Sequence, residues 1–116
     1  MNVQHRDLVT GRWWTLSLAE QLGNIGSEVS RAARWSLKNP EMAERALHRA
    51  LELFDLTLAD PRLRESPARL KEVARAREVV GDFFAGPNQY RSDAASLQKY
   101  FDAYAVAVRL RGARTD

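Results

Sequence analysis

The 116-residue sequence contains no cysteine and only two histidines. Without thiols the chain can form neither a disulfide nor a thiolate metal site, which fits a reducing compartment, and we expect a cytoplasmic location. No apolar run approaches the roughly 18–20 residues that cross a bilayer, so no membrane partner is expected. The first ten residues also lack the apolar core of a signal peptide. Length and composition fit one globular domain.

Alternation of apolar and polar residues with period two is missing as well, so the sequence predicts no sheet. Every long segment instead repeats its apolar residues at spacings of three and four. This pattern predicts an all-α fold, an antiparallel up-down-up-down four-helix bundle over residues 12–110. We expect an N-terminal arm over residues 1–11 and a frayed basic tail over residues 111–116. The expected helices cover about 12–37, 40–59, 67–84 and 93–109.

Cap and breaker residues set these limits. Residues 17–20 (SLAE) form a capping-box pattern inside the first helical segment. Residues 39–40 (NP) and 66–67 (SP) each place a capping side chain before a proline at the first helical position. Residues 60–66 are expected to be a loop, and the cluster at 85–88 (AGPN) ends the third helix.

The first segment carries two parallel seams of different size. Its bulky stripe consists of Leu18, Leu22, Ile25, Val29 and Ala32, and the seam one position further on consists of Ala19, Gly23, Gly26, Ser30 and Ala33. Two glycines inside a helix cost about 1 kcal/mol each. Close packing of another helix is the ordinary compensation. We therefore predict that the small-residue seam is pressed against a neighbouring helix.

Small residues and tryptophans together motivate the leading functional hypothesis. Two consecutive tryptophans cannot both face one core, and partly exposed tryptophans often anchor interfaces. We expect a non-enzymatic protein that acts through protein contacts, as a homo-oligomer or with another protein partner. The interface candidates are Trp13, Trp14, Gly23, Gly26, Ser30, Trp35 and Tyr90.

A line of polar residues follows the same helix. Asn24, Glu28 and Arg31 recur at spacings of four and three. If a neighbouring helix covers this line, the polar groups need partners, and Arg75 or Arg77 of the third helix could provide them. The pattern predicts an interhelical polar network that fixes helix register. A ligand pocket or an oligomer contact is the alternative.

Basic residues gather between positions 62 and 77, where six stand against two acids. The preceding segment, residues 39–60, carries five acids, so pairing between neighbouring helices is one explanation. A nucleic-acid surface is the other, and it makes a nucleic-acid-binding accessory protein the first alternative function. Its candidate residues are Arg62, Arg64, Arg69, Lys71, Arg75 and Arg77, with Arg109, Arg111 and Arg114 as an auxiliary arm.

Carboxylates provide a third hypothesis. They form pairs at i, i+3 or i, i+4: Glu41 with Glu44, Glu52 with Asp55, and Glu78 with Asp82. The first two pairs resemble the motif of helical nucleotide pyrophosphatases of the MazG kind, which implies Mg²⁺-dependent hydrolysis. That family places its pairs on separate helices, whereas here both lie on one expected helix. We assign no catalytic residue, no metal ligand and no cofactor.

Three further stretches carry a family resemblance. The run from residue 14 to residue 29 (WTLSLAEQLGNIGSEV) resembles the start of certain small, uncharacterised prokaryotic helical proteins. Residues 53–61 (LFDLTLADP) and 98–101 (QKYF) add to this similarity. The resemblance implies a small helical fold and assigns a function to no residue.

Overall fold

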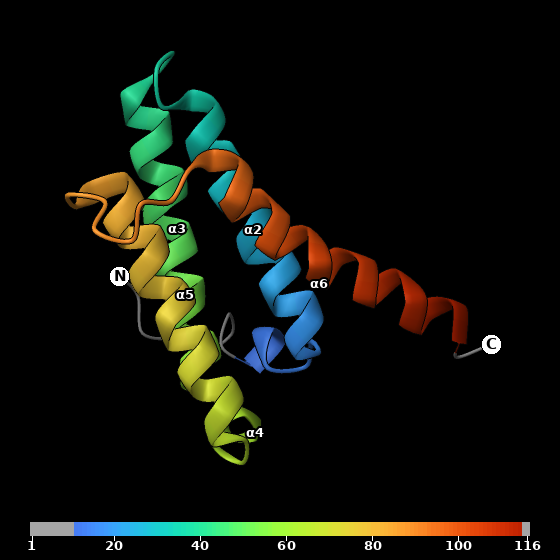
Figure 1. Ribbon diagram of the computed structural model, residues 1–116. Coiled ribbons are helices and arrows are strands. Elements are labelled where there is room, and N and C mark those ends of the chain that lie inside the picture. The colour runs from blue at the N-terminus through green and yellow to red at the C-terminus, as the bar shows by residue number, and fades with distance from the viewer. Residues whose placement is uncertain (1–10, 115–116) are drawn as a thin grey trace.

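The computed structural model describes the backbone of residues 11–114 and the side chains of residues 11–104 and 106. Within these residues the regular structure is helical, without a strand, so the predicted all-α class is confirmed. Most of the predicted N-terminal arm and the last two residues of the tail lie outside the described residues. The helices are α2 (Leu18–Trp35), α3 (Pro40–Leu58), the short α4 (Pro61–Arg64), α5 (Pro67–Ala85) and α6 (Ala94–Arg114), as Figure 1 shows.

The first long helix begins later than the expected residue 12, because the capping box interrupts the chain. Ser17 has an extended backbone, and its hydroxyl accepts the N–H of Glu20 at 3.1 Å. In return, the Glu20 carboxylate accepts the N–H of Ser17 at 3.0 Å. Residues 11–13 form a separate helical turn before this cap. A reciprocal pair of side-chain caps therefore starts α2 at Leu18.

The segment expected to be a loop over residues 60–66 contains α4. The Asp60 side chain accepts the N–H of Arg62 at 2.9 Å and so caps this short helix. Pro61 stands at its first position, where its missing N–H costs nothing. Leu63 is buried in the core, which holds α4 in place.

The bulky stripe of α2 forms the centre of the core. Leu22, Ile25 and Ala32 are completely buried, and α2 packs against both α3 and α6. Phe54 of α3 and Phe101 of α6 meet in this core with ring centroids 6.2 Å apart. The periodicity of the first segment therefore identifies its buried face correctly.

The small-residue seam of α2 receives α6 at one point. A Cβ atom built on Gly26 would lie only 2.5 Å from Cβ of Phe101. This close approach of α6 confirms the predicted packing of the seam at Gly26. A Cβ atom built on Gly23 would meet nothing within 4 Å, so the seam is open there.

The four long helices form a series rather than a ring of equal contacts. α6 packs on α2, α2 on α3, and α3 on α5, so α5 and α6 stand at the two ends of the series. α5 buries only Val73 and Val80 completely. Figure 1 shows the C-terminal part of α6 extending past the other helices. No described helix combines the length and the apolar character needed to span a bilayer.

Candidate functional site

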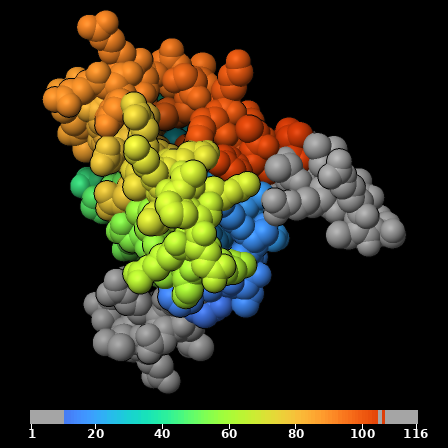
Figure 2. Space-filling view, turned by 60° about the horizontal axis from the view of Figure 1, so that its bottom comes forward, coloured from blue at the N-terminus to red at the C-terminus, as the bar shows by residue number. Residues whose placement is uncertain are grey.

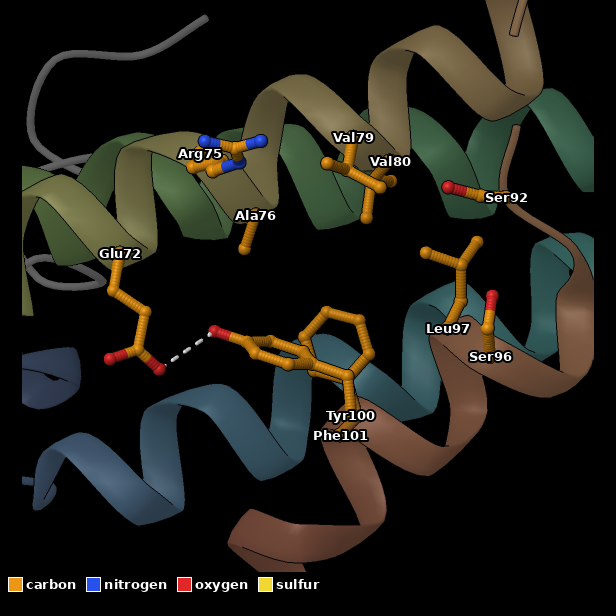
Figure 3. Close-up of a pocket in the computed structure, with 10 residues that line it drawn as sticks. All are labelled: Glu72, Arg75, Ala76, Val79, Val80, Ser92, Ser96, Leu97, Tyr100 and Phe101. Atoms are coloured by element: carbon orange, nitrogen blue, oxygen red, sulfur yellow. Dashed lines mark hydrogen bonds between the residues drawn. The ribbon is translucent and has the colours of Figure 1, made fainter. Parts of the chain in front are cut away.

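An apolar cleft lies between α5 and α6, where the series of helices fails to close. Its volume is about 260 Å³, and it is open to solvent. The buried side chains of Val80, Leu97 and Phe101 line it, together with the half-buried Ala76 and Val79 (Figure 3). In the space-filling view, atoms of α5 (yellow) and of α6 (orange to red) meet on one face of the molecule (Figure 2).

Two tyrosines and a carboxylate close one end of the cleft. The hydroxyls of Tyr104 and Tyr100 on α6 donate to Oε1 of Glu72 on α5, at 2.5 and 3.3 Å. Burial of the two phenols raises the pKa of both tyrosines above its usual range. Both hydroxyls therefore stay protonated at neutral pH and keep donating to Glu72. This pair of hydrogen bonds links α5 to α6 directly.

A tightly held loop forms the other end. The Asp82 carboxylate accepts the backbone N–H groups of Gln89 and Tyr90 at 2.9 and 3.0 Å. Asn88 and Arg91 have positive φ, and the loop therefore reverses the chain within a few residues. Because Asp82 lies on α5, these hydrogen bonds set the spacing between the end of α5 and the start of α6.

Tyr90 connects this loop to the side of α5. Its hydroxyl donates to Glu78 at 3.0 Å, and the Arg75 guanidinium lies 5.5 Å from the centre of its ring. The hydrogen bond to the Glu78 carboxylate raises the pKa of Tyr90. Tyr90, an interface candidate from the sequence, therefore lies near the cleft and remains partly exposed.

The chemistry available in the cleft is that of apolar binding. Its deep surface is carbon, and the polar groups of Glu72, Arg75, Ser92 and Ser96 lie among its lining residues. The ten lining residues include no histidine or cysteine to activate a hydroxyl. Among the described residues, no group of three or more His, Cys, Asp or Glu side chains is arranged to hold a metal ion.

The other interface candidates lie elsewhere. Trp13 is 8% exposed and donates its indole N–H to Thr57 of α3 at 2.9 Å. Trp14, partly buried, donates to the Leu56 carbonyl at 2.8 Å. Both indoles therefore cover the end of α3 within the same chain. Gly23 and Ser30 line a shallow polar groove beside α6, and Trp35 is partly buried at the end of α2.

The polar network predicted on α2 has a different partner from the one expected. Glu28, 9% exposed, accepts from Arg31 at 2.6 Å and from Arg49 of α3 at 2.7 Å. Arg77 of α5, one of the two arginines expected to be partners, binds Asp55 instead. Asn24 is exposed and donates to the Glu20 carbonyl of its own helix. The network thus joins α2 to α3, because those two helices are neighbours.

The six basic candidates separate into two groups. Arg62 binds the buried Asp60 at 2.6 Å, Arg77 binds Asp55, and Arg75 lies over Tyr90, so these three act within the fold. The others, Arg64, Arg69 and Lys71, are exposed and form no ion pair with a described side chain. The side chains of Arg109, Arg111 and Arg114 lie outside the described residues.

The acid pairs do not converge. Glu41, Glu44, Glu52 and Asp55 are exposed on α3, with Asp55 bound to Arg77. Glu78 and Asp82 on α5 accept from Tyr90 and from the loop backbone.

One buried polar cluster was not expected from the sequence. The Gln21 amide donates to the Trp13 carbonyl and to Asp60, and Trp13 donates to Thr57. Gln21 and Thr57 lie among apolar positions of their helices, so their spacing was the signal for burial. The cleft was also not predicted, because the apolar pattern of α5 alone does not reveal which of its residues lack a covering helix.

Comparison of the sequence with protein-family models, with curated proteins and with solved structures finds no match. The candidate site therefore rests on the geometry of this chain.

Proposed function

We propose that the chain is a non-enzymatic protein that acts through protein contacts and associates with itself, with the α5–α6 cleft as its contact surface. The scaffold for this role is an antiparallel four-helix bundle that is left open between α5 and α6. The observation that carries the proposal is the apolar cleft, whose floor of Val80, Leu97 and Phe101 is continuous with the core.

The energetics of such a cleft favour a protein partner. Burying apolar area releases about 25 cal/mol per Å². A concave apolar site can therefore take a bulky side chain as an interface anchor. The loop held by Asp82 and the hydrogen bonds to Glu72 keep α5 and α6 at a fixed spacing. The site is thus formed before a partner arrives, which lowers the entropic cost of binding.

A nucleic-acid-binding role is the second candidate. It is favoured by the exposed Arg64, Arg69 and Lys71, which lie on α4 and the first turns of α5. Retention on single-stranded DNA or RNA that weakens steeply with salt would be its signature. The Mg²⁺-dependent hydrolase has less support, because its acids are dispersed among the described residues.

The contact proposal is tested by placing a charge on the wall of the cleft. We expect Val79→Lys to abolish self-association, because the cation would have to be desolvated in the contact, whereas in the free chain it can extend into water. Size-exclusion chromatography with light scattering should show wild-type mass rising above the 13.2 kDa of one chain with concentration, and Val79→Lys staying at 13.2 kDa.

Met42→Lys is the matched control, because Met42 is 40% exposed on α3 and does not line the cleft. It should associate like the wild type. A wild-type chain that stays monomeric at millimolar concentration contradicts self-association, and association that survives Val79→Lys contradicts the cleft as the contact.

A further inference from the structure

We propose that a depression beside α2 and α3 is an anion site, and that it binds a small phosphate monoester with an apolar body. The site shares no lining residue with the α5–α6 cleft, so it does not depend on the proposed function. The feature that carries the proposal is an unequal group of charges. Two arginines, Arg31 and Arg49, share the single carboxylate of Glu28.

Glu28 gives one carboxylate oxygen to each arginine. Its Oε1 accepts from Nη1 of Arg31 at 2.6 Å, and its Oε2 accepts from Nε of Arg49 at 2.7 Å. Glu28 is buried, whereas the side chains of Arg31 and Arg49 are 56% and 53% exposed. The buried carboxylate therefore holds two guanidinium groups in defined positions at the surface.

Both guanidinium groups keep most of their hydrogen-bonding capacity. A guanidinium carries five N–H donors, and among the described residues each of these two arginines uses one of them, on Glu28. One carboxylate also neutralises only one of the two cations. The pair therefore has the free donors and the uncompensated positive charge that a second oxyanion would satisfy.

The depression beside this pair has room for an organic molecule. Its volume is about 640 Å³, and it is open to solvent. Asn24, Ser27 and Arg31 of α2 provide polar lining, and the buried Trp13 and the half-buried Leu16 and Leu53 provide apolar lining. Small-molecule sites commonly combine an apolar surface with a few convergent polar groups. The lining therefore suits an anion that carries an apolar body.

Arg12 adds a third cation. It is exposed, lines the depression and forms no ion pair with a described side chain. With Arg31 and Arg49, three guanidinium groups face the one carboxylate of Glu28, which leaves a surplus of two positive charges. A phosphate monoester carries nearly two negative charges at neutral pH, because its second pKa is about 6. A carboxylate carries only one, so the charge favours the phosphate.

Two acids stand near the depression without lining it. Glu20 of α2 and Glu52 of α3 are exposed. The Glu20 carboxylate already accepts the N–H of Ser17. The exposed Arg45, two turns before Glu52 on α3, carries the opposite charge. With these neighbours included, four arginines stand against three glutamates, so the surroundings reduce the positive charge of the site without cancelling it.

The first test compares four ligands that separate the head group from the body. These are phenyl phosphate, inorganic phosphate, benzoate and phenol, titrated at low ionic strength. We expect phenyl phosphate to bind at least about tenfold more tightly than any other, because it alone combines a dianion with an apolar ring. Proton–nitrogen correlation NMR that includes the arginine Nε–H signals measures the affinities and should show shifts at Arg31 and Arg49.

The second test removes single charges. Arg12→Ala leaves the Glu28 pair intact and should weaken phenyl phosphate binding by about tenfold, with an unchanged thermal midpoint because Arg12 is exposed. Arg31→Ala should weaken binding at least as much. Arg64→Ala is the matched control, because Arg64 is an exposed arginine of α4 outside the depression. Glu52→Gln should tighten binding by about twofold, since a nearby negative charge is removed.

The outcomes separate this site from the other surfaces. Phenyl phosphate that binds no more tightly than inorganic phosphate, or that does not bind, contradicts the site. Benzoate binding as tightly as phenyl phosphate overturns the phosphate assignment. If binding is lost in Arg64→Ala but kept in Arg12→Ala, the anion lies on the basic surface of α4 and α5, and the proposal is wrong. Val79→Lys should bind phenyl phosphate like the wild type, whatever its effect on self-association.

Discussion

Gly23 and Gly26 lie three positions apart on α2, slightly less than one helical turn, and have opposite surroundings. At Gly26, the space that a methyl group needs is occupied by Phe101 of α6, whose Cβ and Cγ would lie 2.5 and 2.8 Å away. At Gly23, the same space is empty. The two glycines therefore separate the packing role of a small residue from its conformational cost.

Alanine at each position should have opposite effects. We expect Gly26→Ala to lower the free energy of unfolding by about 2 kcal/mol, because overpacking against Phe101 outweighs the gain in helix propensity. Gly23→Ala should raise it by about 0.5–1 kcal/mol. Urea denaturation followed by circular dichroism measures both. A stabilised Gly26→Ala would mean that α6 does not lie on the seam.

Asp60 carries a second residue-scale effect, through its charge. It is 3% exposed and accepts from the Arg62 guanidinium, the Arg62 N–H and the Gln21 amide. The hydrogen bonds from Arg62 outweigh burial and lower the pKa of Asp60 below its ordinary value of 3.8. The ionised form therefore favours the folded state.

The pH dependence follows from that sign. The stabilisation by Asp60 is complete above the unfolded pKa near 3.8 and is lost as the pH falls through the lower folded pKa. We expect Asp60→Asn to lower the free energy of unfolding by about 2 kcal/mol at pH 7, with the difference from wild type closing below about pH 4. Urea titrations between pH 2 and 7 test this.

The control for Asp60 is Asp102→Asn, since Asp102 is exposed and accepts only from the neutral Gln98 amide among the described residues. It should leave the stability nearly unchanged across the same range. A difference between wild type and Asp60→Asn that persists at pH 2 would show that the charge of Asp60 is not what stabilises the fold.

At the scale of helices, α2 and α6 differ in how firmly they are held. α2 is enclosed by α3 and α6, and its bulky stripe is buried from Leu22 to Ala32, with Leu18 partly buried. α6 packs on α2 through Phe101 and reaches α5 through Tyr100, Tyr104 and the acceptor Glu72. Removing that acceptor should loosen one helix rather than the whole fold.

Glu72→Ala should therefore speed amide exchange in α6 by roughly tenfold, the equivalent of one hydrogen bond to a charged group. Exchange in the middle of α3 should not change. Hydrogen–deuterium exchange mass spectrometry with peptide resolution measures this. Glu72→Gln keeps an acceptor for the tyrosines and should behave more like the wild type, and equal exchange in all three proteins would contradict a link through Glu72.

Two of the helix caps could be predicted from the sequence because capping contacts are local. The Ser17–Glu20 box and the Asn39 cap act between residues three positions apart, and both form as their patterns indicate. The partner of Glu28 could not be predicted from the sequence, because it depends on which helices become neighbours. The pattern suggested Arg75 or Arg77, which lie on α5, and α3 supplies Arg49 instead. Long-range choices of this kind are decided by the whole packing.

At the scale of the whole molecule, the all-α class was accessible because no segment alternates with period two. The opening between α5 and α6 could not be predicted from the sequence. Val79 and Ala76 lie on an apolar pattern that would look the same in a closed bundle. Their exposure depends on the spacing that Asp82 and the loop impose on α6. The candidate contact surface is thus a property of the assembled helices.

Leu37 illustrates the same limit from the other side. In the sequence it lies at the expected end of the first helix, whereas α2 ends at Trp35 and leaves it in solvent. Whether a leucine at a helix end is covered or projects depends on where the turn after it begins. Its exposure therefore emerged only with the fold.

The bonds of Trp13 and Trp14 to α3 also bear on how the chain is made. The indole of Trp13 donates to a hydroxyl 44 residues later in the sequence, and the indole of Trp14 donates to a carbonyl 42 residues later. Both rings are translated before the groups that accept from them, so their N–H groups first donate to water. They can reach these acceptors only once α3 has followed them out of the ribosome.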